Sequence, residues 1–390
     1  MSTTLASPGL LKPFSPDHFP ASPFSERLRQ PFLLGLFLPI QSGGWTASTL
    51  PRSTDWRFEY NAALAQQAEA LGFDLVFALS QWLPKGGYNH VQDGQALDSF
   101  IAIGAMAAIT KQILLISTVH VLYGPWNPLH FAKFGATLDH ISNGRWGINV
   151  VTGHRAVEHE MFGWTRIEHD ERYVRAAEFL DAVEHLWAAD DNADLDGRTF
   201  HLRGAYVTPK PKFGRPVLVT ATGSEAGIEF ATNYSDLVFI TSPTGTEFET
   251  ARAALPAHTA SIKARAAKKG RSVRTIINPM VILAETDAKA AAYAEAIIEY
   301  AQPAGFNFGK FDSDAHAWAK RKDYDTERQR RLGGGNIQII GGPEKVADSL
   351  VRLHAAGVDG AQLSFYDFAA DLERFGQLVL PLLQQKGLRL

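Results

Sequence analysis

The chain has 390 residues, 45% of them hydrophobic and 20% charged, so it can bury the core of one large domain or two. A net charge of −3 gives no electrostatic reason to expect nucleic acid or an anionic membrane as a partner. The absence of cysteine excludes thiol nucleophiles, disulfides and cysteine-bound metals. No stretch approaches the roughly 20 apolar residues of a membrane helix, and the N-terminus has no secretory pattern, so the expected location is the cytoplasm.

Strands and helices are predicted to alternate along most of the chain. Residues 1–30 are rich in Ser and Pro and predict an irregular arm that packs on the barrel or on a partner subunit. Strands are predicted at 32–40, 74–80, 113–121, 145–151, 216–222, 237–241, 275–283 and 360–365. Helices are predicted at 58–71, 96–110, 128–141, 168–187, 224–233, 247–269, 287–300 and 343–356.

The strands are near-continuous apolar runs, which is typical of a parallel sheet that is buried on both faces. Eight strand–helix units in about 350 residues favour an α/β protein with a single (β/α)8 TIM barrel over residues 31–390. An open dinucleotide-binding sheet would carry G-x-G-x-x-G after the first strand. The run Pro39 to Gly44 lacks that spacing.

Two insertions interrupt the barrel pattern. Residues 190–212 are polar and predict a small hairpin. Residues 301–335 are polar, basic and glycine-rich, and a loop of this length is usually functional. They predict a mobile lid over the site, with a surface excursion or a subunit contact as the alternative. The run Gly333 to Gly335 lacks the Lys-Ser/Thr of a phosphate-binding loop and favours a hinge.

Functional groups of a barrel lie at the carboxyl ends of its strands. Here those ends are rich in aromatic, amide and hydroxyl side chains and poor in paired carboxylates, which suits a flat cofactor better than hydrolysis. A phosphate site is predicted where Ser224 follows a strand and opens a helix, because helix N-termini attract anions. A plain N-cap is the alternative for Ser224. The groups after the other strands are Trp82, Thr118, His120, Asn149, Asn278, Met280, Phe365 and Tyr366.

Two motifs stand in order between residues 136 and 173: LDHISNGRWGINVVTG and, further on, HDERY. Together they resemble the bacterial luciferase-like monooxygenases, which use reduced FMN and oxygen. The resemblance runs from about Phe32 to Leu383 and is closest to the branch with sulfone, sulfonate and pyrimidine oxygenases.

The resemblance implies roles for particular residues. Thr118 and Asn149 match positions implicated in placing oxygen near flavin N5, although the sequence leaves activation at C4a open. His120 and Tyr366 complete the candidate catalytic set, and Tyr366 matches a family tyrosine near the flavin. For Asn149 an interior structural amide, and for Glu158 a solvated carboxylate, are the alternatives. The candidate FMN-binding residues are Trp82, Leu83, Thr118, Asn149, Glu158, Arg172, Tyr173 and Ser224.

Asn278-Pro279-Met280 stands where sulfonate monooxygenases carry Arg-x-His, so we expect a small neutral substrate that is oxidised with C–S or C–N cleavage. The candidate substrate residues are Trp126, Asn278, Met280 and Phe365, with Trp82 and His120 as further walls. The run His154 to Glu160 lacks metalloprotease spacing, so no metal is expected.

The chain has no nicotinamide motif of its own, so a separate NAD(P)H-dependent flavin reductase is the expected partner. We also expect a homodimer or homotetramer. Two other functions remain open at this stage: a deazaflavin (F420)-dependent hydride transferase on the same barrel, and a non-catalytic flavin-binding barrel.

Overall fold

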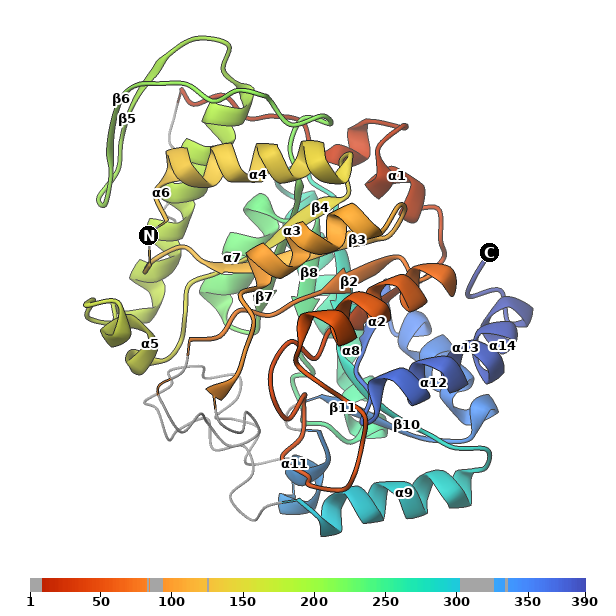
Figure 1. Cartoon of the computed structure of the whole chain (residues 1–390). Helices are drawn as coiled ribbons and strands as arrows, with labels where there is room; N and C mark the ends of the chain where they lie inside the picture. Colours follow the sequence, from red (N-terminus) through yellow and green to blue (C-terminus); the bar gives the residue numbers. More distant parts are fainter. Residues whose placement is uncertain (1–8, 83, 85–93, 125, 302–325, 334–335) are drawn as a thin grey trace.

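The computed structural model describes residues 9–82, 84, 94–124, 126–301, 326–333 and 336–390 (Figure 1). Eight parallel strands close into a barrel, and the last strand pairs back to the first, which confirms the predicted TIM barrel. In order around the barrel they are β1 (Leu33–Phe37), β2 (Leu75–Phe77), β3 (Leu114–His120), β4 (Trp146–Val151), β7 (Val217–Thr222), β8 (Leu237–Ile240), β9 (Arg274–Ile277) and β12 (Gly360–Leu363).

Helices surround the barrel, and most of their boundaries follow capping signals in the sequence. The predicted helix at 128–141 begins after Asn127, whose side chain accepts from Leu129 N–H, and ends at Asn143, which has a φ of 57°. The α-helices are α1 (Pro23–Arg27), α2 (Phe58–Ala70), α3 (Ser99–Ile109), α4 (Pro128–Ser142), α5 (Ala156–Met161), α6 (His169–Ala188), α7 (Glu225–Tyr234), α8 (Phe248–Ala267), α9 (Asp287–Glu299), α11 (Glu327–Gly333), α12 (Pro343–Ala355), α13 (Phe368–Leu378) and α14 (Leu380–Gln385).

The predicted strand at 275–283 is divided in the structure. Its first part is β9, which lies in the barrel wall between β8 and β12. Its second part, β10 (Pro279–Leu283), no longer pairs with β8 and instead pairs in parallel with β11 (Ile337–Gly341). On the other side β10 stays bonded to the residue after β12, because Ser364 N–H donates to the Pro279 carbonyl over 3.0 Å and Val281 N–H donates to the Ser364 carbonyl over 2.9 Å. Asn278 therefore lies at the point where the chain exchanges β8 for β11 as its neighbour.

Alternate side chains separate two apolar layers. One set fills the barrel interior: Leu33, Phe37, Leu75, Phe77, Leu114, Ile116, Val217, Val219, Leu237, Phe239 and Ile276, with Phe24 among them. The other set, which includes Ala361, Leu363 and Phe365 of the last strand–loop unit, packs between the strands and the helices. Along β12 this alternation turns Gly360, Gln362 and then Ser364 toward the interior.

Two additions to the barrel, the described part of the N-terminal arm and a hairpin, lie outside its ring of strands. Residues 9–32 of the arm pack on the barrel at its amino end, where Phe24 of α1 joins the interior cluster and Lys12 reaches Asp181 and Glu184 of α6 at 3.0 and 3.2 Å. The predicted hairpin is present as antiparallel β5 (Ala193–Asp196) and β6 (His201–Ala205), and it extends outward beside α6 (Figure 1).

Most of the predicted lid, residues 302–325 and 334–335, lies outside the described residues, and α11 is its described part. None of the helices within the described ranges combines the length and the apolarity needed to cross a membrane.

Candidate active site at the carboxyl end of the barrel

Thr118 and Asn149 form a hydrogen-bonded pair on neighbouring strands. They lie opposite each other in the register of β3 and β4, and Asn149 Nδ2 donates to Thr118 Oγ1 over 3.2 Å. The Ala221 N–H of β7 donates to Asn149 Oδ1 over 3.0 Å, which fixes which way the amide faces. Ser99 Oγ donates to the Thr118 carbonyl over 2.8 Å and so holds its backbone. The pair is therefore positioned, with one Asn149 N–H and the Thr118 hydroxyl hydrogen left for a ligand.

A small cradle follows β7 where helix α7 begins. The Ser224 side chain caps this helix by accepting from Gly227 N–H over 3.1 Å. A Cβ on Gly227 would collide with Thr222 Oγ1 and would lie 2.7 Å from the Tyr173 hydroxyl. Glycine is thus required for these two hydroxyl groups to approach the helix end.

This cradle fits the phosphate of FMN. Thr222 Oγ1 is buried and has no hydrogen-bond partner among the described residues. Its hydroxyl can therefore donate a hydrogen bond to a bound ligand. The helix N-terminus adds backbone N–H groups and a positive potential. The predicted residues Tyr173 and Ser224 are brought together here. Sequence reasoning placed Thr222 at this strand end but assigned the phosphate contact to Ser224, and it missed Gly227, which lies three residues after Ser224.

Arg172 is buried beside the loop that follows β4. Its side chain is 1% exposed, and its Nη1 donates to the carbonyl of Gly153 in the loop after β4. The guanidinium therefore supports this loop, and its predicted contact with phosphate remains a prediction.

Glu158 is the centre of a buried network above β3 and β4. Its Oε2 accepts from the Tyr123 hydroxyl over 2.8 Å, and its Oε1 accepts from Arg155 Nη1 over 2.8 Å. Burial alone would raise the pKa of Glu158, but Arg155 and His120 outweigh it, and the pKa lies below the usual value. Both carboxylate oxygens are thus engaged by protein groups, and the predicted flavin contact of Glu158 remains untested.

His120 lies beside this network and is kept neutral. Its ring stacks on Tyr123 with centroids 4.9 Å apart, and its Nε2 is 4.0 Å from Glu158 Oε2. Burial lowers the pKa of His120 to about 4, despite the opposing effect of Glu158. Burial, and then Glu158, also raise the pKa of Tyr123 well above its usual value. At neutral pH His120 therefore offers a neutral imidazole rather than a cation.

Amide groups form the opposite side of the barrel end. Asn278 Nδ2 donates to Asn336 Oδ1 and Ser364 Oγ donates to Asn278 Oδ1, each over 3.0 Å. These contacts join the end of β9, the residue before β11 and the end of β12. Met280 is fully buried in the cluster beneath β10 and β11. Sequence reasoning placed Asn278 and Ser364 at strand ends but missed Asn336.

Tyr366 is held by the loop after β1. Its hydroxyl donates to the Leu50 carbonyl over 2.6 Å, and Arg52 lies over its ring at 4.4 Å. Burial lowers the pKa of Arg52. The Arg52 guanidinium also donates to the carbonyls of Gly43 and Thr46 at 2.8 and 3.3 Å. This cation is thus occupied in holding the loop.

The other predicted site residues make aromatic contacts. Phe365 packs against Phe368 and Phe375 in the helical layer, and Trp126 packs against Phe100 and Phe131. Trp82 is 38% exposed and contacts Phe162. Leu83 lies outside the described residues.

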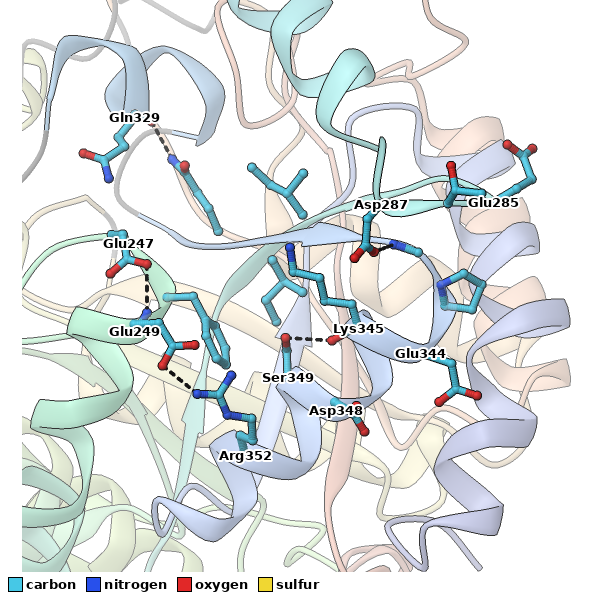
Figure 2. A pocket seen from close by; sticks show the side chains of 17 residues that line it. Glu247, Glu249, Glu285, Asp287, Gln329, Glu344, Lys345, Asp348, Ser349 and Arg352 are labelled. Carbon is cyan, nitrogen blue, oxygen red and sulfur yellow. Dashed lines mark hydrogen bonds and ion pairs between the residues drawn. The ribbon is translucent and has the colours of Figure 1, made fainter. Parts of the chain in front are cut away.

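A separate pocket of about 890 Å³ opens between the N-terminal ends of α8 and α12 and strand β11 (Figure 2). It contains six carboxylates, but each is engaged by a neighbouring cation or backbone N–H, for example Glu249 by Arg352 at 2.5 Å and Asp287 by Gly342 N–H at 2.7 Å. The others are Glu247, Glu285, Glu344 and Asp348. Within the described ranges, no three His, Asp or Glu side chains gather in a metal-binding arrangement.

The closed parallel barrel, with oriented amide and hydroxyl groups and the helix N-terminus at Ser224 at one end, defines a TIM-barrel protein with a candidate cofactor site at that end. Residues 33–360 match the family described as luciferase-like monooxygenase. The chain belongs to this family, as its two motifs predicted, and the match covers most of its length.

Relatives within the family have known activities. The chain is 33% identical over 359 residues to the FMNH2-dependent dimethylsulfone monooxygenase of Pseudomonas fluorescens, covering 90% of this chain and 93% of that protein. It is 32% identical over 365 residues to the pyrimidine monooxygenase RutA of Allorhizobium ampelinum, covering 91% and 96%. The crystal structure of DmoA from Hyphomicrobium sulfonivorans has a TM-score of 0.76 at 23% identity, covers 92% of this chain and 89% of that one, and shares the fold. The monooxygenase class that the sequence predicts is thus the class of these relatives.

Proposed function

We propose that this chain is the oxygenase of a two-component system, which takes FMNH2 from a separate NAD(P)H-dependent flavin reductase and uses O2 to oxidise a small neutral substrate. The observation that carries the proposal is the unpaired Thr222 hydroxyl in a cradle that only glycine at position 227 leaves open. The relatives that share the family, one of them named for FMNH2, support the same cofactor. The proposal includes cleavage of a C–S or C–N bond, because the neutral substrates considered, sulfones and nitrogen heterocycles, contain these bonds.

The residues have separate tasks in this proposal. Thr222, Ser224 and Tyr173 bind the phosphate, while Thr118 and Asn149 offer hydrogen-bond donors at the ends of β3 and β4. Reduced FMN, when bound, supplies the two electrons with which one atom of O2 enters the substrate and the other leaves as water. The neutral His120 adds no further charge to the Arg155–Glu158 ion pair beside it. The aromatic interior below the site excludes water.

The substrate is proposed to be neutral because the end of β9 carries the amide Asn278, held by Ser364 and Asn336. An amide can pair with the oxygen of a sulfone or of a heterocyclic carbonyl. It supplies no charge to balance a sulfonate, whose burial among such groups would be costly.

A second copy of this chain is the proposed partner in the native oligomer. Helices α3 and α4 lie side by side on the outside of the barrel (Figure 1). They expose large apolar side chains: Ile101 is 72% exposed, Phe134 48% and Ile141 55%. A net charge of only −3 opposes self-association weakly. A dimer would bury these side chains, which a monomer leaves in water.

The experiment is a coupled assay with FMN, NADH, a flavin reductase and O2, in which substrate loss and oxygen use are followed together. A panel of sulfones, sulfonates and nitrogen heterocycles should give turnover with neutral members only. Turnover restricted to alkanesulfonates would refute the neutral-substrate proposal. Reduction of F420 by an alcohol, with no FMN binding, would support the hydride-transferase alternative.

A further inference from the structure

Gln362 is a buried amide that has no hydrogen-bond partner among the residues that the structure describes. It is 1% exposed, and neither its Nε2 nor its Oε1 has a hydrogen-bond partner among the described residues. Native proteins rarely bury both a donor and an acceptor unpaired, because each loses its bond to water without compensation. The exceptions are often sites that receive a ligand or an ordered water.

Gln362 extends the amide row at the substrate side of the barrel. It turns inward on β12, two residues before Ser364, and it lies opposite Gly35 of β1. Because Ala361 pairs with Ile277 of β9, the next step along both strands places Gln362 level with Asn278. Asn278 and Ser364 are already bonded to each other, whereas Gln362 is not.

Aromatic rings flank this row inside the barrel. Phe37, Phe77 and Phe239 lie on β1, β2 and β8 with ring centroids 5.2 to 6.1 Å apart. Trp45 lies over Phe37 with a centroid distance of 3.9 Å. The side chains of Phe37 and Phe239 are 6% and 9% exposed, so a flat molecule at the barrel mouth would pack on the open edges of these two rings, with hydrogen-bonding groups beside it.

We propose that Gln362 determines substrate specificity by recognising a secondary amide edge, that is, an N–H beside a C=O in a small, flat, neutral molecule such as a lactam or cyclic imide. The substrate N–H donates to Gln362 Oε1, and Gln362 Nε2 donates to the substrate carbonyl, so that both orphaned groups are paired at once. A sulfone has acceptors only and leaves Oε1 unpaired. This inference rests on the proposed function, since it concerns the substrate of the same site.

The test is equilibrium binding, measured by calorimetry on the FMN-loaded protein and on the protein alone. The probes are 2-pyridone, which carries the amide edge, N-methyl-2-pyridone, which lacks the donor, and dimethyl sulfone. The variant is Gln362→Met, which keeps the shape and removes both polar atoms. The matched control is Gln338→Met on β11, whose Nε2 donates to the Gln329 carbonyl outside the barrel.

The wild type and Gln338→Met should bind 2-pyridone about 10-fold or more tighter than its N-methyl form, as expected for paired hydrogen bonds. Gln362→Met should lose this preference yet melt at or above the wild-type temperature, because it removes unpaired buried groups. A wild type without the preference, or a Gln362→Met protein that keeps it, would overturn the proposal and assign Gln362 to a bound water. FMN affinity, measured separately, tests the proposed function independently of this result.

Discussion

Thr222 offers a substitution whose effects on the free protein and on cofactor binding have opposite signs. Replacing Thr222 by Val keeps the branched shape at the end of β7 and deletes a hydroxyl that is buried and unpaired. Removing such a group leaves the free energy of unfolding unchanged or raises it by about 1 kcal/mol. If the hydroxyl binds the FMN phosphate, the lost charge-assisted hydrogen bond is worth about 1.5–3 kcal/mol, which is a fall in affinity of about 10- to 150-fold.

The assay compares FMN with riboflavin, which has the same ring and no phosphate. Quenching of flavin fluorescence gives both dissociation constants, and thermal unfolding of the free protein gives the stability. Thr222→Val should weaken FMN and leave riboflavin unchanged. Gly227→Ala, which places a methyl group against Thr222 and Tyr173, should act in the same direction. Gly104→Ala in α3, near a flexible Leu138 methyl, controls for the change in helix propensity. Equal loss of FMN and riboflavin would refute the phosphate assignment.

Three further outcomes are expected. Thr118→Val should cost about 1 kcal/mol of stability and, in the coupled assay, lower the product formed per FMNH2 consumed while H2O2 release rises. Because the pKa of His120 is about 4 when folded and about 6.5 when unfolded, acidification from pH 6.5 to 4 should remove roughly 3 kcal/mol of stability, and His120→Phe should flatten this part of the stability–pH curve. Ile101→Lys with Phe134→Lys should shift the sedimenting species toward monomer, and Leu378→Lys, at an exposed site elsewhere, should not.

The barrel could be predicted because its strands are mostly apolar runs and several of its helices begin at a residue whose side chain caps them, such as Asp98, Asn127 and Ser224. The division at Pro279 was missed because both halves of 275–283 are equally apolar. Only tertiary pairing with β11 separates them. Helix α5 was missed because it is only six residues long and follows a polar loop.

The candidate site was predictable only where a residue type is unusual for its place. Thr118, Asn149 and Asn278 are polar groups in apolar strands, and the structure gives each a defined hydrogen-bond partner. The direction of a long side chain was not predictable. Arg172 stands in a motif that suggests phosphate, yet its guanidinium turns to the Gly153 carbonyl, and Phe365 turns to the helical layer because of strand alternation.

In the proposed function, the substrate and the cofactor lie at two sides of the barrel end that are built differently. On the side of β3, β4 and β7 the wall is continuous, and its polar groups are fixed by neighbouring strands. On the other side β10 pairs with β11 in place of β8, and Asn336, the residue before β11, accepts from Asn278 Nδ2. The amide at the end of β9 is thus oriented by a residue that is not part of the barrel strands. Under the proposed function, a substitution at Asn336 should therefore alter substrate binding while the Thr118–Asn149 pair and the groups around Gly227 stay as they are.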